Sequence, residues 1–227
     1  MPVEIFDFKF GINHCYLIKD KGAIIIDSGP PFAGKNFLKK LADYSIAPKE
    51  IKLIVLTHGD FDHAGCAKEM QEICGAKIAI HEKDRINLEE GIFNWPKGVT
   101  TWGKISRSLL LPLLKNNVNL KTVKADIVLD GREMSLEKYG IDGKIIYTPG
   151  HTIGSVSVLL DSGEAFVGCM AHSGFPFRLS PGLPIYAENI DLLKESWKLL
   201  IDRGGTMIYP AHGNPFPAEE IKKYIYR

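Results

Sequence analysis

Four potential metal ligands fall within six residues of this chain. The motif THGDFDHAG at residues 57–65 contains His58, Asp60, Asp62 and His63. A mostly apolar run at residues 51–56 precedes it, as expected for a strand buried on both faces of a sheet. Apolar residues then recur at helical spacing over residues 67–74. We therefore expect the ligands on the loop that leaves a buried strand, a usual place for chemistry on a rigid scaffold.

The spacing of these residues favours two metal ions over one. His58 and His63 are five residues apart, so they are not the i, i+4 pair that a zinc-binding helix presents on one face. Asp62 and His63 are neighbours, and neighbours on a helix do not face the same way. Imidazole and carboxylate ligands suit zinc or iron. The aspartates of the motif favour somewhat harder metal ions. The alternative is that the motif is only an acidic turn exposed to solvent. Four potential ligands so close together behind a buried strand argue against this alternative.

The composition is ordinary for a globular protein. Of 227 residues, 45% are apolar and 24% are charged, and no linker divides the chain, so we expect one domain over residues 1–227. The net charge of +1 predicts neither a nucleic acid nor a membrane as a partner. The sequence shows no export signal, no membrane span and no zinc-finger or disulfide pattern of cysteines, so a cytoplasmic location is the expectation.

Further candidate ligands follow other predicted strands. Residues 148–155 contain one Pro and two Gly, which allow a tight turn that presents His151. A strand at residues 165–167 is expected to end just before Cys169, and the last strand, residues 206–209, leads to His212. Three other histidines are expected not to bind metal. They are His14 on the first strands, His81 at a strand end and His172 beside the pocket.

Residues 86–120 depart from this alternation of strands and helices. They contain Ile92, Phe93, Trp95 and Trp102, followed by an apolar run at residues 109–114. We interpret the segment as a mainly helical insertion. Its aromatic residues would either line a substrate pocket or cap the core, and the sequence leaves both alternatives open.

Four motifs in this order resemble the metallo-β-lactamase superfamily, whose metal loop has the pattern His-x-His-x-Asp-His. An acidic residue, Asp27, ends an early strand, and the metal loop follows at residues 57–65. A Pro-Gly-His-Thr segment with a following Gly-Ser spans residues 149–155, and His212 follows a short strand. The resemblance implies an α/β fold, an αββα sandwich of two mixed β-sheets flanked by helices, with a metal site at one edge.

The resemblance also implies a set of ligands. The first metal would take His58, Asp60 and His151. The second would take Asp62, His63 and His212, with Cys169 either bridging the metals or joining the second site. Two positions depart from the family pattern. Asp60 occupies the position of the second His in the family motif, and Cys169 occupies the position of the Asp that usually bridges the metals. The alternatives are that Asp60 only fixes a neighbouring ligand and that Cys169 is a small buried hydrophobic residue.

The function implied is metal-dependent hydrolysis. Two divalent metal ions, zinc in preference to iron or manganese, would supply a metal-bound hydroxide that attacks a small ester, thioester, lactone or phosphoester, with Asp62 as the catalytic residue. The alternatives are an iron-containing redox protein or dioxygenase of the same superfamily and a non-catalytic metal-binding module. The expected partner is a small-molecule substrate, and a homo-oligomer is left open.

Overall fold

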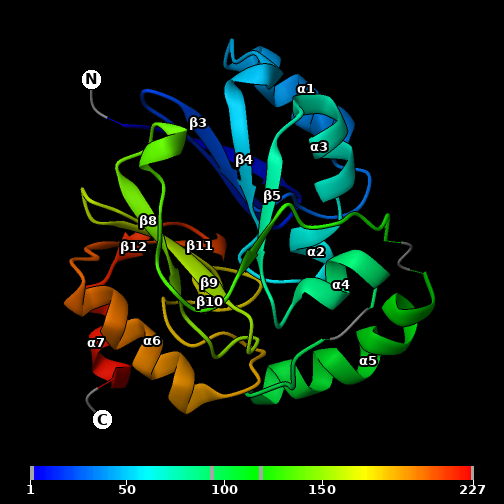
Figure 1. Ribbon diagram of the computed structural model, residues 1–227. Helices are drawn as coiled ribbons and strands as arrows, with labels where there is room; N and C mark the ends of the chain where they lie inside the picture. The colour runs from blue at the N-terminus through cyan, green and yellow to red at the C-terminus, as the bar shows by residue number, and fades with distance from the viewer. Residues whose placement is uncertain (1–2, 93–94, 118–119, 226–227) are drawn as a thin grey trace.

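Two mixed β-sheets, each of six strands, organise the chain (Figure 1). The computed structural model describes residues 3–92, 95–117 and 120–225. For residues 114–117 it describes the backbone alone. The first sheet has the order β1-β2-β3-β4-β5-β6, and its last four strands are parallel. The second has the order β12-β11-β10-β9-β8-β7, in which only β10 and β11 are parallel. The predicted sandwich of two mixed sheets is confirmed.

The strands are β1 (Glu4–Phe10), β2 (Asn13–Lys19), β3 (Ala23–Ile26), β4 (Ile51–Val55), β5 (Lys77–His81), β6 (Ile127–Leu129), β7 (Met134–Ser135), β8 (Gly143–Tyr147), β9 (Val156–Leu160), β10 (Glu164–His172), β11 (Met207–His212) and β12 (Phe216–Pro217). The α-helices are α1 (Gly34–Asp43), α2 (Phe61–Ala64), α3 (Ala67–Cys74), α4 (Arg85–Glu90), α5 (Thr101–Asn117), α6 (Ile190–Asp202) and α7 (Glu219–Ile225). Two 3₁₀ turns are η1 (Pro48–Glu50) and η2 (Glu137–Tyr139).

Side chains that alternate along the central strands build the layers. On β3, Ile25 belongs to the apolar cluster under α1 and α3, whereas Ile24 and Ile26 face the second sheet. The other face of the second sheet is covered by α6 and α7, where Trp197 is fully buried. The order helix, sheet, sheet, helix therefore follows from strands that are apolar on both faces. No helix in the described ranges has the length and apolar character needed to cross a membrane.

Several element boundaries differ from the predicted ones. The strand predicted for residues 165–167 is the nine-residue β10, and its pairing with β11 shifts register around Gly168, so Cys169 lies inside the strand. His212 is the last residue of β11 and does not follow it. The two-residue strand β12 was not predicted. Phe93, predicted as part of the insertion, lies outside the described residues.

Gly168 lets β10 pass close to the metal loop. Its φ is +55°, and a Cβ atom there would lie 2.3 Å from Thr57 Oγ1. We expect Gly168→Ala to lower the free energy of unfolding by about 2–5 kcal/mol, because backbone strain adds to overpacking. The control is Gly174→Ala, whose φ is +79° but whose Cβ would meet no atom within 4 Å, so only strain of about 1–2 kcal/mol remains. Equal losses in urea denaturation would contradict the close contact.

Candidate metal centre

The seven predicted ligand residues lie together at the edge where the two sheets meet. His58 lies in the loop that follows β4, and His63 lies in α2. His151 lies in the turn between β8 and β9, and Cys169 and His212 lie on β10 and β11 of the second sheet. The ligand atoms of His58, His151 and Cys169 all lie within 4.8 Å of one another, and so do those of His63, Cys169 and His212. The Cys169 sulfur is therefore common to both groups.

The two aspartates complete the two groups. Asp60 Oδ2 lies 3.5 Å from His58 Nε2 and 3.3 Å from His151 Nε2. Asp62 Oδ2 lies 3.4 Å from His212 Nε2 and 3.8 Å from His63 Nε2. Asp60 therefore lies beside the first group and Asp62 beside the second, and their division between two metals stays a prediction.

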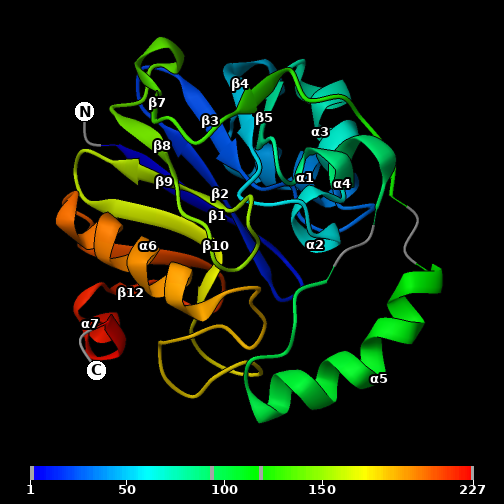
Figure 2. The same cartoon turned by 60° about the horizontal axis from the view of Figure 1, so that its bottom comes forward.

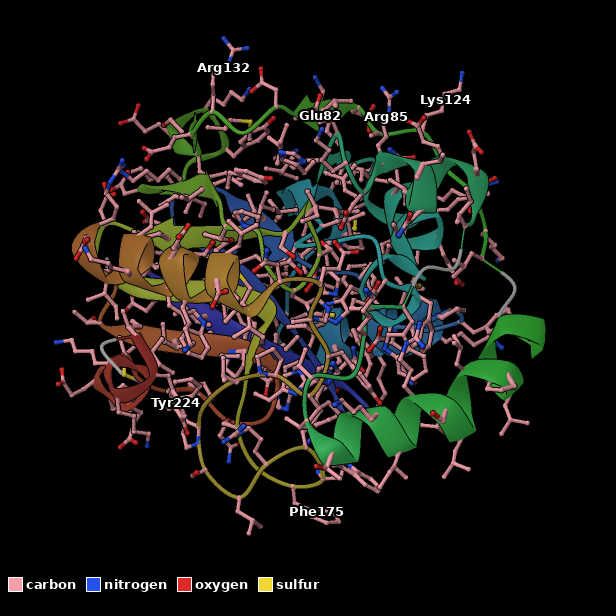
Figure 3. All side chains as sticks on the ribbon, turned by 90° about the horizontal axis from the view of Figure 1, so that it is seen from below. Glu82, Arg85, Lys124, Arg132, Phe175 and Tyr224 are labelled. Carbon is pink, nitrogen blue, oxygen red and sulfur yellow. The ribbon has the colours of Figure 1, made fainter. Side chains whose placement is uncertain are left out.

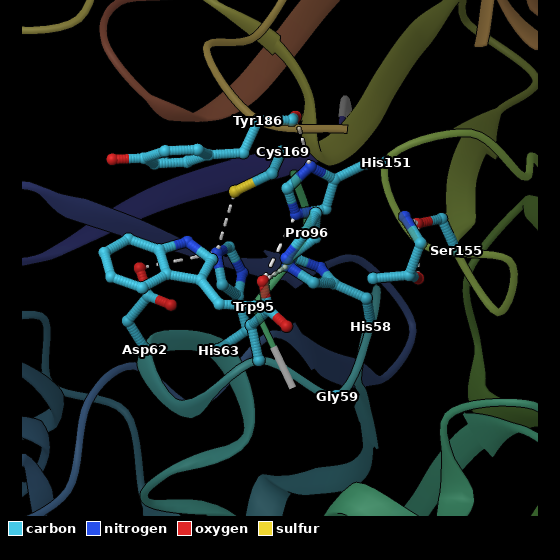
Figure 4. Close-up of polar contacts among 12 residues, drawn as sticks. His58, Gly59, Asp62, His63, Trp95, Pro96, His151, Ser155, Cys169 and Tyr186 are labelled. Carbon is cyan, nitrogen blue, oxygen red and sulfur yellow. Dashed lines mark hydrogen bonds and ion pairs between the residues drawn. The ribbon is translucent and has the colours of Figure 1, made fainter. Parts of the chain in front are cut away.

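Four imidazoles are held so that the Nε2 atoms face the centre. His58 Nδ1 lies 2.9 Å from Thr57 Oγ1, whose hydroxyl donates to Asp27. His63 Nδ1 donates to Asp27 Oδ2 at 2.8 Å (Figure 4 shows His58, His63 and His151). His151 Nδ1 donates to the Tyr186 carbonyl at 3.0 Å, and that of His212 to the Ile12 carbonyl at 3.1 Å. These partners accept a hydrogen bond from Nδ1, so in the neutral imidazole the proton sits on Nδ1. The lone pair of Nε2 is then available to bind a metal ion.

Neighbouring charges hold the pKa values of several candidate ligands away from their usual range. Burial raises the pKa of the Cys169 thiol, but the surrounding His63, His212 and His151 outweigh it and hold that pKa well below its usual value. Burial lowers the pKa of His151, but the Cys169 thiolate and the Asp60 carboxylate raise it to about 10. The buried Cys169 thiolate and Asp60 carboxylate thus hold a proton on His151, and a divalent cation bound by these residues would replace that proton as their counter-charge.

Unpaired buried atoms support the fit of a metal. Within the described residues, His58 Nε2 and Asp60 Oδ1 have no hydrogen-bond partner although both are buried. Such atoms are costly to bury unless something binds them. Imidazole, carboxylate and thiolate together form a donor set that suits zinc or iron. The residues present therefore fit divalent metal binding.

Other residues hold the ligand loops in place, and the sequence did not single them out. Asn13 Nδ2 donates to the backbone oxygen of Asp62 at 2.8 Å and to its Oδ2 at 3.1 Å. Asp84 Oδ2 accepts from Gly59 N and from Thr152 Oγ1, which ties the metal loop to the His151 turn. Asp84 follows β5, a neighbour of β4, so its place at the carboxyl end of a parallel strand was the available signal.

An apolar cavity of about 170 Å³ opens above the ligands. Its wall contains Ile12, Phe61, Trp95, Leu110, Phe177 and Tyr186, and its floor contains Asp60, Asp62, His151, Cys169, His172 and His212. Trp95 and Leu110 come from the predicted insertion, so part of that segment lines the cavity. Trp102 does not line it and contributes to a neighbouring groove.

The three histidines that were expected not to bind metal lie outside the two ligand groups, and their non-ligand role stays a prediction. His172 lines the cavity, is buried, and has no hydrogen-bond partner among the described residues for either ring nitrogen. Burial lowers its pKa to about 4, so the ring is neutral near pH 7. His81 stacks on Tyr147 with ring centroids 4.4 Å apart, and His14 Nδ1 contacts Asp7. Neither His81 nor His14 lines the cavity.

Asp60 should limit the zinc affinity of the first group. We expect Asp60→His to slow the loss of zinc to a chelator roughly tenfold, because imidazole is a good zinc ligand and the position faces two imidazoles. Zinc per chain during dialysis is the measurement, with the exposed Asp161→His as control. Unchanged or lower zinc retention would mean that Asp60 only positions the neighbouring imidazoles.

Comparisons with known proteins identify the family. The family model of the metallo-β-lactamase superfamily matches residues 9–212. A probable metallo-hydrolase of Methanocaldococcus jannaschii is 28% identical over 204 residues, which cover 88% of this chain and 87% of that protein. Hydroxyacylglutathione hydrolase of Haemophilus influenzae is 26% identical over 178 residues, 77% of this chain and 74% of that enzyme.

A solved structure shows the same fold. The metallo-β-lactamase superfamily protein of Sulfolobus tokodaii superposes with a TM-score of 0.68 at 22% identity, over 97% of this chain and 84% of that one. The match to the family model covers most of the chain and includes all seven candidate ligands. This chain therefore belongs to the metallo-β-lactamase superfamily.

Proposed function

We propose that this protein hydrolyses a small activated ester or thioester at a dinuclear metal centre, with lactones and phosphoesters as the neighbouring substrate classes. The observation that carries the proposal is the convergence of four imidazoles, each with Nδ1 hydrogen-bonded, on one thiolate and two carboxylates. Two divalent ions bound there would supply Lewis-acid polarisation of a carbonyl or phosphoryl oxygen and activation of water.

The protein's own groups would hold the substrate and move a proton. Asp62 lines the cavity with 21% of its side chain exposed, and Asn13 fixes its carboxylate. Burial raises the pKa of Asp62, but the neighbouring His63 and His212 lower it well below its usual value, so the carboxylate is ionised and can orient a water molecule in the cavity. In this proposal Asp62 takes up the proton of that water as the reaction proceeds. The neutral imidazole of His172 can hydrogen-bond to a polar group of the substrate.

The cavity favours a small reacting group. Its volume of about 170 Å³ is below the roughly 300–1,000 Å³ of common ligand pockets, and its walls are largely apolar. The named substrate of the Haemophilus influenzae relative is an acylglutathione, which is a thioester. Small acyl esters and thioesters are therefore the first substrates to test.

The test uses a panel of small esters, thioesters, lactones and phosphodiesters. We expect hydrolysis of at least one ester or thioester by protein purified without a chelating column, loss of the activity on chelation, and recovery with zinc. Element analysis of the same preparation should give two metal ions per chain. Redox-active iron without any hydrolysis would favour the redox alternative, and full metal occupancy without either activity would favour a binding module.

A further inference from the structure

The helix α5 and the segment after β10 expose apolar side chains on one face, which we call the α5 face. It contains Trp102, Ile105 and Leu109 of α5 with Phe175 and Leu179 of the neighbouring segment. Their exposed fractions are 52%, 50%, 67%, 89% and 97%. Trp102, Phe175 and Leu179 line one groove of about 650 Å³. Figure 2 shows α5 standing out from the two sheets, and Figure 3 shows Phe175 pointing outward beside it. Exposed apolar surface of this extent marks a contact with something else.

The two segments that form the α5 face carry charged residues of one sign only. Residues 91–117 and 173–187 contain no Asp or Glu, and their basic residues are Lys97, Lys104, Arg107, Lys115 and Arg178. The whole chain, by contrast, has 28 basic and 27 acidic residues, so its net charge conceals this asymmetry. Among the described residues, Lys97, Lys104, Arg107 and Arg178 take part in no ion pair. A partner for this face should therefore be both apolar and negatively charged.

The apolar and basic character of the α5 face favours some candidate partners over others. A symmetric contact with a second copy would place each basic face against itself, and like charges would oppose each other. A nucleic acid would match the charge but offers no apolar phase for Ile105, Leu109 and Leu179. Helices that lie in the surface of a bilayer combine Trp, Phe and Leu with Lys and Arg, as α5 and its neighbours do.

We propose that the α5 face docks on an anionic lipid bilayer. Trp102, Leu109 and Leu179 would enter the boundary between headgroups and acyl chains, and Lys97 and Lys104 would lie among anionic headgroups. Leu110 and Phe177 lie at the junction with the metal site, because Leu110 lines the cavity and Phe177 lines both cavity and groove. The docked protein would thus hold its cavity at the lipid surface, where substrates with apolar chains are concentrated.

The experiment is flotation with vesicles. We expect wild-type protein to float with phosphatidylcholine vesicles that contain about 30% phosphatidylserine, and at least tenfold less with pure phosphatidylcholine or high salt. The double variant Leu109→Asp, Leu179→Asp should lower the bound fraction at least tenfold. Its control is Leu38→Asp, a leucine on α1 that is 44% exposed away from this face, which should bind like wild type.

A second pair of variants tests the charges. Lys97→Glu with Lys104→Glu should weaken binding to the anionic vesicles at least tenfold, whereas Lys35→Glu with Lys39→Glu on α1 makes the same change in net charge and should not. Wild-type protein that stays unbound, or binds neutral vesicles equally well, would overturn the proposal. So would a dimer in light scattering that Leu109→Asp, Leu179→Asp converts to a monomer. None of these readouts needs metal or catalysis, so they are independent of the proposed hydrolysis.

Discussion

Replacing Asp62 with Asn should lower kcat/KM for the best ester or thioester on the order of 10³-fold, within the range for loss of general acid–base catalysis. Asn keeps the shape and the place for the Asn13 contact, but its amide cannot accept a proton. Because an amide oxygen is still a weak ligand, we expect this variant to retain most of its metal. Rates measured at saturating zinc therefore separate proton transfer from metal loss. An Asn variant as active as the wild type would exclude Asp62 as the proton acceptor.

The variant Asp62→Ala tests the same carboxylate as a ligand. It should lose most of the metal held with His63 and His212, since their Nε2 atoms would face a site with one anion fewer. Metal per chain after gel filtration is the measurement, and Asp161→Ala in an exposed turn is the matched control. Equal metal content in wild type and Asp62→Ala would show that Asp62 is not a ligand.

The sequence predicted the fold and the candidate ligands through the resemblance of its four ordered motifs to a known family, and the strand pattern supports the fold. Strands that are apolar on both faces require two covered sheets, and the carboxyl ends of β3, β4 and β5 place Asp27, His58 and Asp84 at one edge. The spacing within residues 57–65 already indicated two groups of ligands. In the structure Asp60 lies near two imidazoles and Asp62 near two others, and the number of metals stays a prediction.

The supporting contacts could not be predicted in the same way. His212 is oriented by the Ile12 carbonyl, 200 positions away, and His151 by the Tyr186 carbonyl. Every residue carries such a carbonyl, so its type reveals nothing, and only the tertiary fold selects the acceptor. The continuation of β10 beyond residue 167 was also not predicted. Gly168 looked like a strand end, whereas it is an irregularity that continues the strand.

The charge asymmetry of the α5 face was also missed, since the net charge averages over the whole chain. The acid-free segments at residues 91–117 and 173–187 are visible in the sequence, but nothing in the sequence places them side by side. Pairing of Gly98 with Tyr186 brings the two together. Surface patches of this kind depend on long-range contacts, which sequence periodicity does not report.

The largest effect on metal binding should come from Cys169→Ala. Its sulfur lies 3.0 Å from His63 Nε2 and is the one ligand atom common to both groups. Losing residues that only support a ligand weakens metal binding about 10–100-fold, so loss of a shared ligand should exceed about 100-fold and affect both sites. Titration of the metal-free protein with zinc should show fewer than two tight sites. In the cobalt-loaded protein, the sulfur-to-metal absorption band should disappear.

Two further variants make this result specific. Cys169→Asp restores an anionic oxygen ligand at the same place, so it should regain two bound metals without regaining the sulfur band. Cys74→Ala removes another buried thiol, on α3 in the cluster under the first sheet, and should leave zinc affinity unchanged. If Cys169→Ala kept two tight zinc sites, the thiol would be a packing residue, and the two groups would be independent mononuclear sites. If Cys169→Asp restored both metals and hydrolysis, an anion that bridges the groups, and not sulfur itself, would be what the chemistry requires.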